Sequence, residues 1–183
     1  MLELLVAETR IADLESALRR AQAAALTDTL TGALNRRGFD QAHEREAARS
    51  RRNARPLALA LIDLDDFKRL NDTLGHQAGD QALIHLVRTL RSALRPSDVL
   101  GRFGGEEFVL MLPDTELDEA VTALTRFQRQ LADCRVTGNG VALTFSAGVV
   151  VQAPGESLAE SIERADTATY AAKRAGKNRV FSG

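Results

Sequence analysis

Apolar residues recur along this chain in two periods, and their alternation predicts a domain built from strands and helices. LALALIDL at 57–64 and EFVLML at 107–112 are nearly continuous apolar runs, which is typical of buried strands. DVLGRF at 98–103 precedes the second run and predicts the other arm of a hairpin. ALTFSAGVVV at 142–151 alternates as a strand does, and RVF at 179–181 predicts a short closing strand.

Apolar residues spaced three and four apart predict helices between these strands. Pro56 closes the first of them, and GHQAGD at 75–80 is expected to be a turn. The helices are expected at 35–53, at 66–74, around Leu83–Leu94, from Leu117 to Leu131, and from Leu158 to Ala172. The resulting order is strand, helices, hairpin, helix, strand, helix, strand. It predicts an α+β domain that resembles a split βαββαβ plan with extra elements.

The first 26 residues form a separate unit in this interpretation, ahead of a domain at 27–183. They contain no Gly or Pro, and a seam of apolar positions recurs in steps of three and four: Leu4, Ala7, Ile11, Leu14, Leu18, Ala21 and Ala25. Such a seam favours a coiled coil that holds two copies of the chain together. The alternative is an amphipathic helix that packs on its own domain, which the many alanines leave open.

The composition is that of an ordinary globular protein. Hydrophobic residues make up 44% and charged residues 27%, and the net charge is -1, so no global field attracts nucleic acid or an anionic membrane. Cys134 is the only cysteine, which excludes an internal disulfide and a multi-cysteine metal site. The longest apolar run, 57–62, is too short to span a bilayer. Acidic residues begin at Glu3, which is not expected of a signal peptide. We therefore expect a cytoplasmic protein without direct membrane insertion.

Carboxylates at two strand ends suggest a metal site. Asp63 ends a buried strand, where a carboxylate needs a cation, a helix terminus or water. Glu106 and Glu107 follow Gly104 and Gly105 at the hairpin tip. The first strand of a βαββαβ sheet lies beside the hairpin, so Asp63 and Glu106 are expected to converge on Mg²⁺. The two glycines would take positive φ and let a ligand approach. The alternative is a routine Gly-Gly turn with solvated glutamates.

Four motifs read together resemble the GGDEF family of diguanylate cyclases: DTLTGALNRRGF (28–39), IDLDDFKRLNDTLGHQAGD (62–80), RFGGEEF (102–108) and YAAKRAGKNRV (170–180). The resemblance covers about residues 27–181. It implies a mostly antiparallel central sheet like that of the polymerase palm and of class III adenylyl cyclases. It also implies that the protein condenses two GTP molecules into cyclic di-GMP and releases pyrophosphate.

The resemblance also implies roles for individual residues. Asp63 and Glu106 would hold Mg²⁺, for which Mn²⁺ can substitute, with the backbone carbonyl of Leu64. Glu107 would support the metal or the nucleophile. Asn71 and Asp80 would read the guanine edge, with Leu30 near the base. The β- and γ-phosphates would be bound by Lys68, Lys173, Lys177 and backbone N–H groups near Asp66 and Phe67.

Taken singly, each of these residues has an ordinary structural interpretation. Asn71 or Asp80 could cap a helix, and Asp63 could pair with Lys68. Lys173 and Lys177 could simply complement a helix dipole. It is the four motifs in family order that favour the nucleotide site.

The chain departs from the family pattern at three positions. Glu106 stands where many members have Asp, a variant that active members also carry. Lys177 stands where some members have Arg, and Lys cannot form the bidentate fork. Asp66 stands where members often have an apolar or aromatic residue. A carboxylate there would weaken GTP binding unless it points to solvent.

A two-fold symmetric product suggests a homodimer with one GTP in each domain, held by the helix at 1–26 and regulated by an upstream sensor in a longer protein. RPSD at 95–98 matches the family's RxxD product site, so Arg95 and Asp98, with Arg126, are expected to bind cyclic di-GMP. Alternatives are a catalytically silent GGDEF domain that binds GTP or cyclic di-GMP, a dimerisation module, and an enzyme making another cyclic dinucleotide.

Overall fold

The computed structural model describes residues 10–17, 25–133, 135–136 and 141–183. Residues 10–17 are helical. The elements that follow are α2 (Arg36–Asn53), β1 (Leu57–Leu64), α3 (Phe67–Leu74), α4 (His76–Ala93), β2 (Val99–Arg102), β3 (Glu107–Pro113), α5 (Leu117–Asp133), β4 (Arg135–Val136), β5 (Val141–Ala142), β6 (Phe145–Val151), α6 (Leu158–Arg174) and β7 (Val180–Ser182). Every helix and strand predicted from residue 35 onward is present, so the α+β prediction is confirmed.

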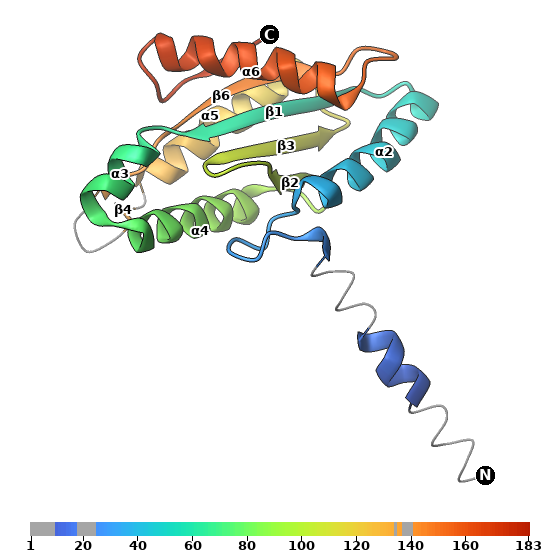
Figure 1. The fold of residues 1–183 in the computed structure, drawn as a ribbon. Coiled ribbons are helices and arrows are strands. Elements are labelled where there is room, and N and C mark those ends of the chain that lie inside the picture. Colours follow the sequence, from blue (N-terminus) through green and yellow to red (C-terminus); the bar gives the residue numbers. More distant parts are fainter. Residues whose placement is uncertain (1–9, 18–24, 134, 137–140) are drawn as a thin grey trace.

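A five-stranded mixed sheet forms the centre of the domain, in the order β2-β3-β1-β6-β7. Strand β1 lies between β3 and β6 and is antiparallel to both, while β7 pairs in parallel with β6 (Figure 1). All eight residues of β1 are buried. A strand that is covered on both faces needs apolar side chains on both, and this explains the continuous run LALALIDL.

Helices cover both faces of the sheet (Figure 1). Even-numbered residues of β1, such as Ile62, join a core cluster with Leu86 of α4 and Leu124 of α5. Odd-numbered residues, such as Leu61, join a second cluster with α2 and Ala165 of α6. Asp63 continues the odd-numbered face, so its side chain is directed toward the layer that contains α6.

Two predicted boundaries are wrong. The segment 75–80 is not a turn, because α4 begins at His76 and only Gly75 separates it from α3. Gly75 adopts a φ of 84° and donates its N–H to the carbonyl of Asn71 at 2.8 Å, so one residue both ends α3 and reorients the chain. The strand expected from residue 142 begins at Phe145, and β5 pairs with β4 in a separate ribbon that the pattern did not predict.

The predicted seam of the first 26 residues is only partly within the described residues. Leu4, Ala7, Leu18 and Ala21 lie outside them. Ile11 and Leu14 are large hydrophobic residues, and they are 56% and 64% exposed. Their exposure does not support packing of residues 10–17 on their own domain. The division into 1–26 and 27–183 stays a prediction.

Candidate active site

The three predicted catalytic carboxylates lie together at the end of the central strands. Asp63 is opposite Glu107 in the register of β1 and β3. The N–H of Leu64 donates to the carbonyl of Glu106 at 3.3 Å, so the hairpin tip is fastened to the end of β1. Pairing between strands that are distant in sequence therefore brings Asp63, Glu106 and Glu107 into one place.

The ammonium group of Lys173, on α6, lies 2.6 Å from Asp63 Oδ2. The Asp63 side chain is only 11% exposed. Burial raises the pKa of Asp63, Lys173 opposes the rise, and the nearby carboxylates of Asp65 and Asp166 add to it. The alternative pairing of Asp63 with Lys68 is wrong, because Lys173 occupies that position.

Burial also raises the pKa of Glu106, and the charge of Asp63 raises it further, while Lys173 opposes the rise. A carboxylate whose charge raises the pKa of a second carboxylate forms with it a region where a cation is stabilised. Among the described residues, no group of three His, Cys, Asp or Glu side chains is poised to hold a metal ion. Asp63 and Glu106 thus offer two carboxylates only, and a small hard cation would complete its shell with backbone, water or phosphate oxygens.

The backbone at Leu64 fits such a shell. In a strand, the N–H and C=O of one residue point toward the same neighbour. Because the N–H of Leu64 points at the hairpin tip, its carbonyl is directed to that side as well. The donor set of two carboxylates and one carbonyl therefore fits Mg²⁺.

Arg102 and Asp28 fix the hairpin tip, and sequence reasoning assigned neither a role. Arg102 donates to the carbonyls of Gly104 and Gly105, at 2.8 Å in the shortest case, and to both oxygens of Asp28 at 3.1 Å. Burial alone would raise the pKa of Asp28, but hydrogen bonds from Thr31 and Arg102 hold it below its ordinary value. Asp28 and Arg102 both belong to motifs that carry the family resemblance, and this is the feature of the sequence that could have indicated their importance.

The expected positive φ at the hairpin tip is wrong. Among the described glycines, Gly32, Gly75, Gly155 and Gly176 have positive φ, whereas Gly104 and Gly105 do not. A Cβ at Gly105 would meet nothing within 4 Å. The tip is therefore open to a ligand at Gly105, whereas a Cβ at Gly104 would lie 2.7 Å from Glu107 Oε2, and the turn closes without a left-handed residue.

The residues predicted to read guanine lie where α3 meets α4. The side chain of Asn71 points at Gly79, where a Cβ would lie 1.9 Å from Asn71 Oδ1. This oxygen is buried and accepts no hydrogen bond from the described protein. Asp80 follows Gly79 in α4 and is exposed, and neither Asn71 nor Asp80 caps a helix. A buried acceptor without a donor is costly, so a ligand that donates to Asn71 would be favoured here.

The other residues predicted to bind the nucleotide differ in their exposure. Lys68 is exposed on α3. Phe67 and Leu30 are partly buried and pack against the first core cluster. The structure brings Asp63, Glu106, Glu107 and Lys173 near one another, and it leaves Lys68 and Asp80 on the surface.

Lys177 lies in the turn after α6, and its ammonium group is 2.7 Å from Asp66 Oδ1. Asp66 also approaches Arg69 at 3.6 Å. The pair with Lys177 lowers the pKa of Asp66. The carboxylate of Asp66 is therefore partly exposed but is held by two cations, which the sequence did not indicate.

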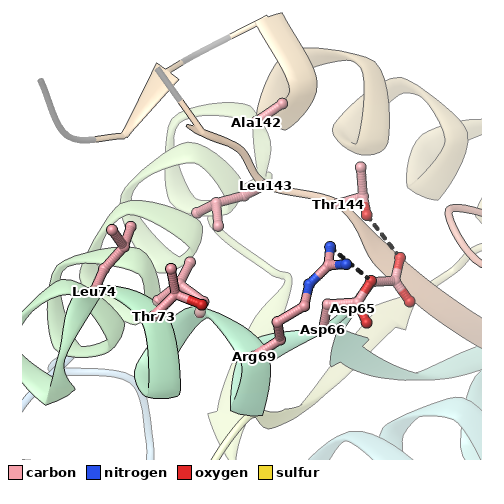
Figure 2. A pocket seen from close by; sticks show the side chains of 9 residues that line it. Asp65, Asp66, Arg69, Thr73, Leu74, Ala142, Leu143 and Thr144 are labelled. Carbon is pink, nitrogen blue, oxygen red and sulfur yellow. Dashed lines mark hydrogen bonds and ion pairs between the residues drawn. The ribbon is translucent and has the colours of Figure 1, made fainter. Parts of the chain in front are cut away.

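A cavity of about 270 Å³ adjoins Asp66 and Arg69 (Figure 2). Its wall includes Thr73 of α3 and Leu143 and Thr144 ahead of β6. Neither Asp63 nor Glu106 lines it. The cavity therefore lies beside the predicted phosphate loop and outside the carboxylate site.

The residues of the predicted product site line a second cavity, of about 300 Å³. Arg95, Asp98 and Arg126 all contribute to its wall, together with Phe127. The N–H of Arg95 donates to Asp98 Oδ2 at 2.8 Å, while Asp98 Oδ1 is buried and has no partner among the described residues. Burial raises the pKa of Asp98. The structure thus gathers the three predicted residues, from α5 and the α4–β2 connection, at one cavity.

No helix within the described residues is long and apolar enough to cross a membrane.

The comparisons with known proteins agree with these motifs. The family model described as diguanylate cyclase, GGDEF domain, matches residues 25–179. The chain is 44% identical to the diguanylate cyclase DgcP of Pseudomonas aeruginosa over 158 residues, 85% of this chain and 24% of that protein. It is 41% identical to the probable diguanylate cyclase DgcC of Escherichia coli over 164 residues, 88% of this chain and 44% of that protein. The chain thus spans less than half of either relative.

Solved structures extend the agreement to the fold. The coiled coil and GGDEF domain of DgcB from Caulobacter crescentus, in complex with c-di-GMP, is similar with a TM-score of 0.91 and 31% identity, over 99% of this chain and 97% of that one. The diguanylate cyclase SiaD of Pseudomonas aeruginosa, in complex with its activator SiaC, is similar with a TM-score of 0.84 and 35% identity, over 100% of this chain and 73% of that one.

Proposed function

Because the chain belongs to the GGDEF family of diguanylate cyclases, we propose that it condenses two GTP molecules into cyclic di-GMP and releases pyrophosphate. The observation that carries this proposal is the carboxylate pair of Asp63 and Glu106, with Lys173 beside it, at the end of the central strands. The reaction requires a site that attracts a cation and a polyphosphate together, and this arrangement of charges supports such a site.

Asp63, Glu106 and the carbonyl of Leu64 would hold Mg²⁺, or Mn²⁺ in its place. When bound, the ion would neutralise charge on the α-phosphoryl group and lower the pKa of the attacking 3′-hydroxyl. Glu107, opposite Asp63, would orient that hydroxyl or the ion. The low exposure of the Asp63 side chain keeps water from screening its charge.

Lysines and the α3–α4 junction would hold the nucleotide. Lys68, Lys173 and Lys177 would bind the β- and γ-phosphates as point charges. Asn71 and Asp80 would pair with the guanine edge, which explains the buried oxygen of Asn71. Asp80 can accept from guanine N1–H and N2–H, so we expect GTP to be preferred over ATP.

We further propose that two copies face each other across a two-fold axis, each presenting one GTP. One site holds one substrate, and both 3′-hydroxyls must reach the opposite α-phosphate. The exposed Ile11 and Leu14 support a seam through the N-terminal helix. An upstream sensor would act by changing the register of that seam. The substrate and the lone cysteine fit the cytoplasm, which stays a prediction.

Product inhibition would use the cavity of Arg95, Asp98 and Arg126. The buried oxygen of Asp98 can accept from a guanine edge, and the arginines can fork onto phosphate or stack on the base. The DgcB structure contains c-di-GMP, which supports a ligand of this class.

The alternative is a silent domain that binds GTP or cyclic di-GMP and regulates a partner. The presence of Asp63, Glu106 and Glu107 in one place favours the enzyme. Incubation of the purified chain with GTP and Mg²⁺, resolved by chromatography, tests the proposal. We expect cyclic di-GMP from the parent chain, and none from Glu106→Gln or from ATP. Binding of GTP without product by the parent would favour the receptor, and no binding at all would refute the site.

A further inference from the structure

Two of the three lysines that the proposed function assigns to phosphate, Lys173 and Lys177, are engaged by carboxylates in this structure. Lys173 lies 2.6 Å from Asp63 and Lys177 lies 2.7 Å from Asp66. Asp63 is expected to exchange its lysine for a metal ion. Asp66 has no metal assigned to it, so its pairing with Lys177 requires another explanation.

The side chain of Asp66 does not cap the helix that follows it. Asp66 precedes α3 with a φ of 56°, and its carboxylate makes no capping hydrogen bond to that helix. It is instead shared by Lys177 and by Arg69, whose guanidinium lies 3.6 Å away (Figure 2 shows the Arg69 contact). If Lys177 left, Arg69 would still compensate the charge of Asp66.

The backbone around Lys177 is held in place, so an exchange of partners can involve its side chain alone. Gly176, Lys177 and Asn178 have φ values of 113°, 61° and 48°. The N–H of Asn178 donates to Asp65 Oδ2 at 2.9 Å. Asp65 also accepts from Thr144 and Ser146, at 2.9 and 2.7 Å. A turn anchored in this way keeps the Lys177 side chain within reach of the loop between β1 and α3.

We propose that Asp66 is a positioning residue that holds Lys177 in the nucleotide-free protein and yields it to the terminal phosphates of GTP, while Arg69 takes over Asp66. This inference rests on the proposed function of the site. Asp66 then competes with the triphosphate for one cation, so it lowers the affinity for nucleotide. In reverse, the same exchange draws Lys177 away from departing pyrophosphate.

Binding of 3′-deoxyGTP with Mg²⁺, measured by calorimetry, tests this exchange. This analogue lacks the attacking hydroxyl, so affinity is read without turnover. We compare the parent chain, Asp66→Asn, Lys177→Met and the double variant, because asparagine tolerates the left-handed backbone at position 66. We expect Asp66→Asn to bind about two- to fivefold more tightly, the range of a partly exposed ion pair. In the Lys177→Met background the same change should have no effect.

Arg69→Gln is the matched variant on the other side of Asp66. It should weaken binding in the parent chain and leave binding unchanged when Asp66 is already asparagine. Melting temperatures of all variants show whether each one is folded.

Two results would overturn the exchange while leaving the cyclase intact. One is weaker or unchanged binding by Asp66→Asn. The other is equal tightening with and without Lys177, which indicates simple charge repulsion. Failure of the parent chain to bind 3′-deoxyGTP would instead overturn the proposed function, and this inference with it.

Discussion

Arg102 connects the hairpin tip to the segment before α2, and its replacement by methionine tests how the tip is positioned. Its guanidinium donates to the carbonyls of Gly104 and Gly105 and to both oxygens of Asp28. The side chains of Arg102 and Asp28 are only 15% and 22% exposed. Methionine keeps the aliphatic stem and removes every one of these donors.

The loss should be large because Asp28 stays largely buried with a charge that only Thr31 then stabilises. Breaking a largely buried ion pair on one side costs about 3 kcal/mol. In a domain of this size such a loss lowers the melting temperature by about 6–12 °C. Glu106 follows the released carbonyls directly, so we also expect kcat to fall more than KM changes.

Arg49→Met is the matched control. Arg49 contacts two carboxylates, those of Glu46 at 3.0 Å and Asp114 at 2.7 Å, but its side chain is 42% exposed. Exposed pairs contribute about 0.2–1 kcal/mol. Thermal and urea unfolding of both variants, with steady-state kinetics on GTP, provide the comparison. Equal losses in the two variants would refute the argument from burial, and an unchanged kcat in Arg102→Met would refute the positioning of Glu106.

Three further predictions concern single residues. Gly79→Ala places a methyl group against Asn71 Oδ1, and displacement of that side chain, at an overpacking cost of about 1–3 kcal/mol, should raise the dissociation constant for GTP about five- to 150-fold; unchanged affinity would exclude Asn71 from guanine binding. Lys173→Met removes the ammonium from Asp63, so added Mg²⁺ should raise its melting temperature more than that of the parent, and equal shifts would contradict this. Because burial raises the pKa of Asp98, the folded state holds this proton more tightly than the unfolded chain does. The stability that this proton contributes is fully present below pH 3.8, the ordinary pKa, and is lost as the pH rises through the raised pKa. Asp98→Asn should therefore reduce the change of unfolding free energy with pH in this range, as measured by unfolding at several pH values.

The order of strands and helices could be predicted because each element carries its own periodic signal. The run at 57–64 indicated a buried strand, and the spacing of Leu117, Val121 and Leu124 indicated a helix. The break at Gly75 was harder, because a single glycine with positive φ ends one helix and precedes the next without a loop. Local sequence therefore determined the type of each element better than its ends.

The identities of the candidate site residues also came from sequence, through four motifs in one order. Their pairing did not. Nothing in the local sequence around Lys173 indicates that it pairs with Asp63. Nothing around Lys177 indicates that it pairs with Asp66 and does not simply face solvent. Which cation meets which carboxylate depends on how α6 crosses the end of β1, and that crossing is fixed by the packing of α6 against the sheet.

The sequence by itself determined the α+β plan, the family and the set of charged residues available for chemistry. Only the tertiary structure decided that Arg102 and Asp28 fix the hairpin tip, that Asn71 fits because Gly79 lacks a side chain, and that Asp66 is held by two cations. The physical reason is the range of the forces. Hydrophobic periodicity arises within one element and can be read along the chain. Ion pairs and buried acceptors depend instead on distances between elements that come close together only when the chain folds.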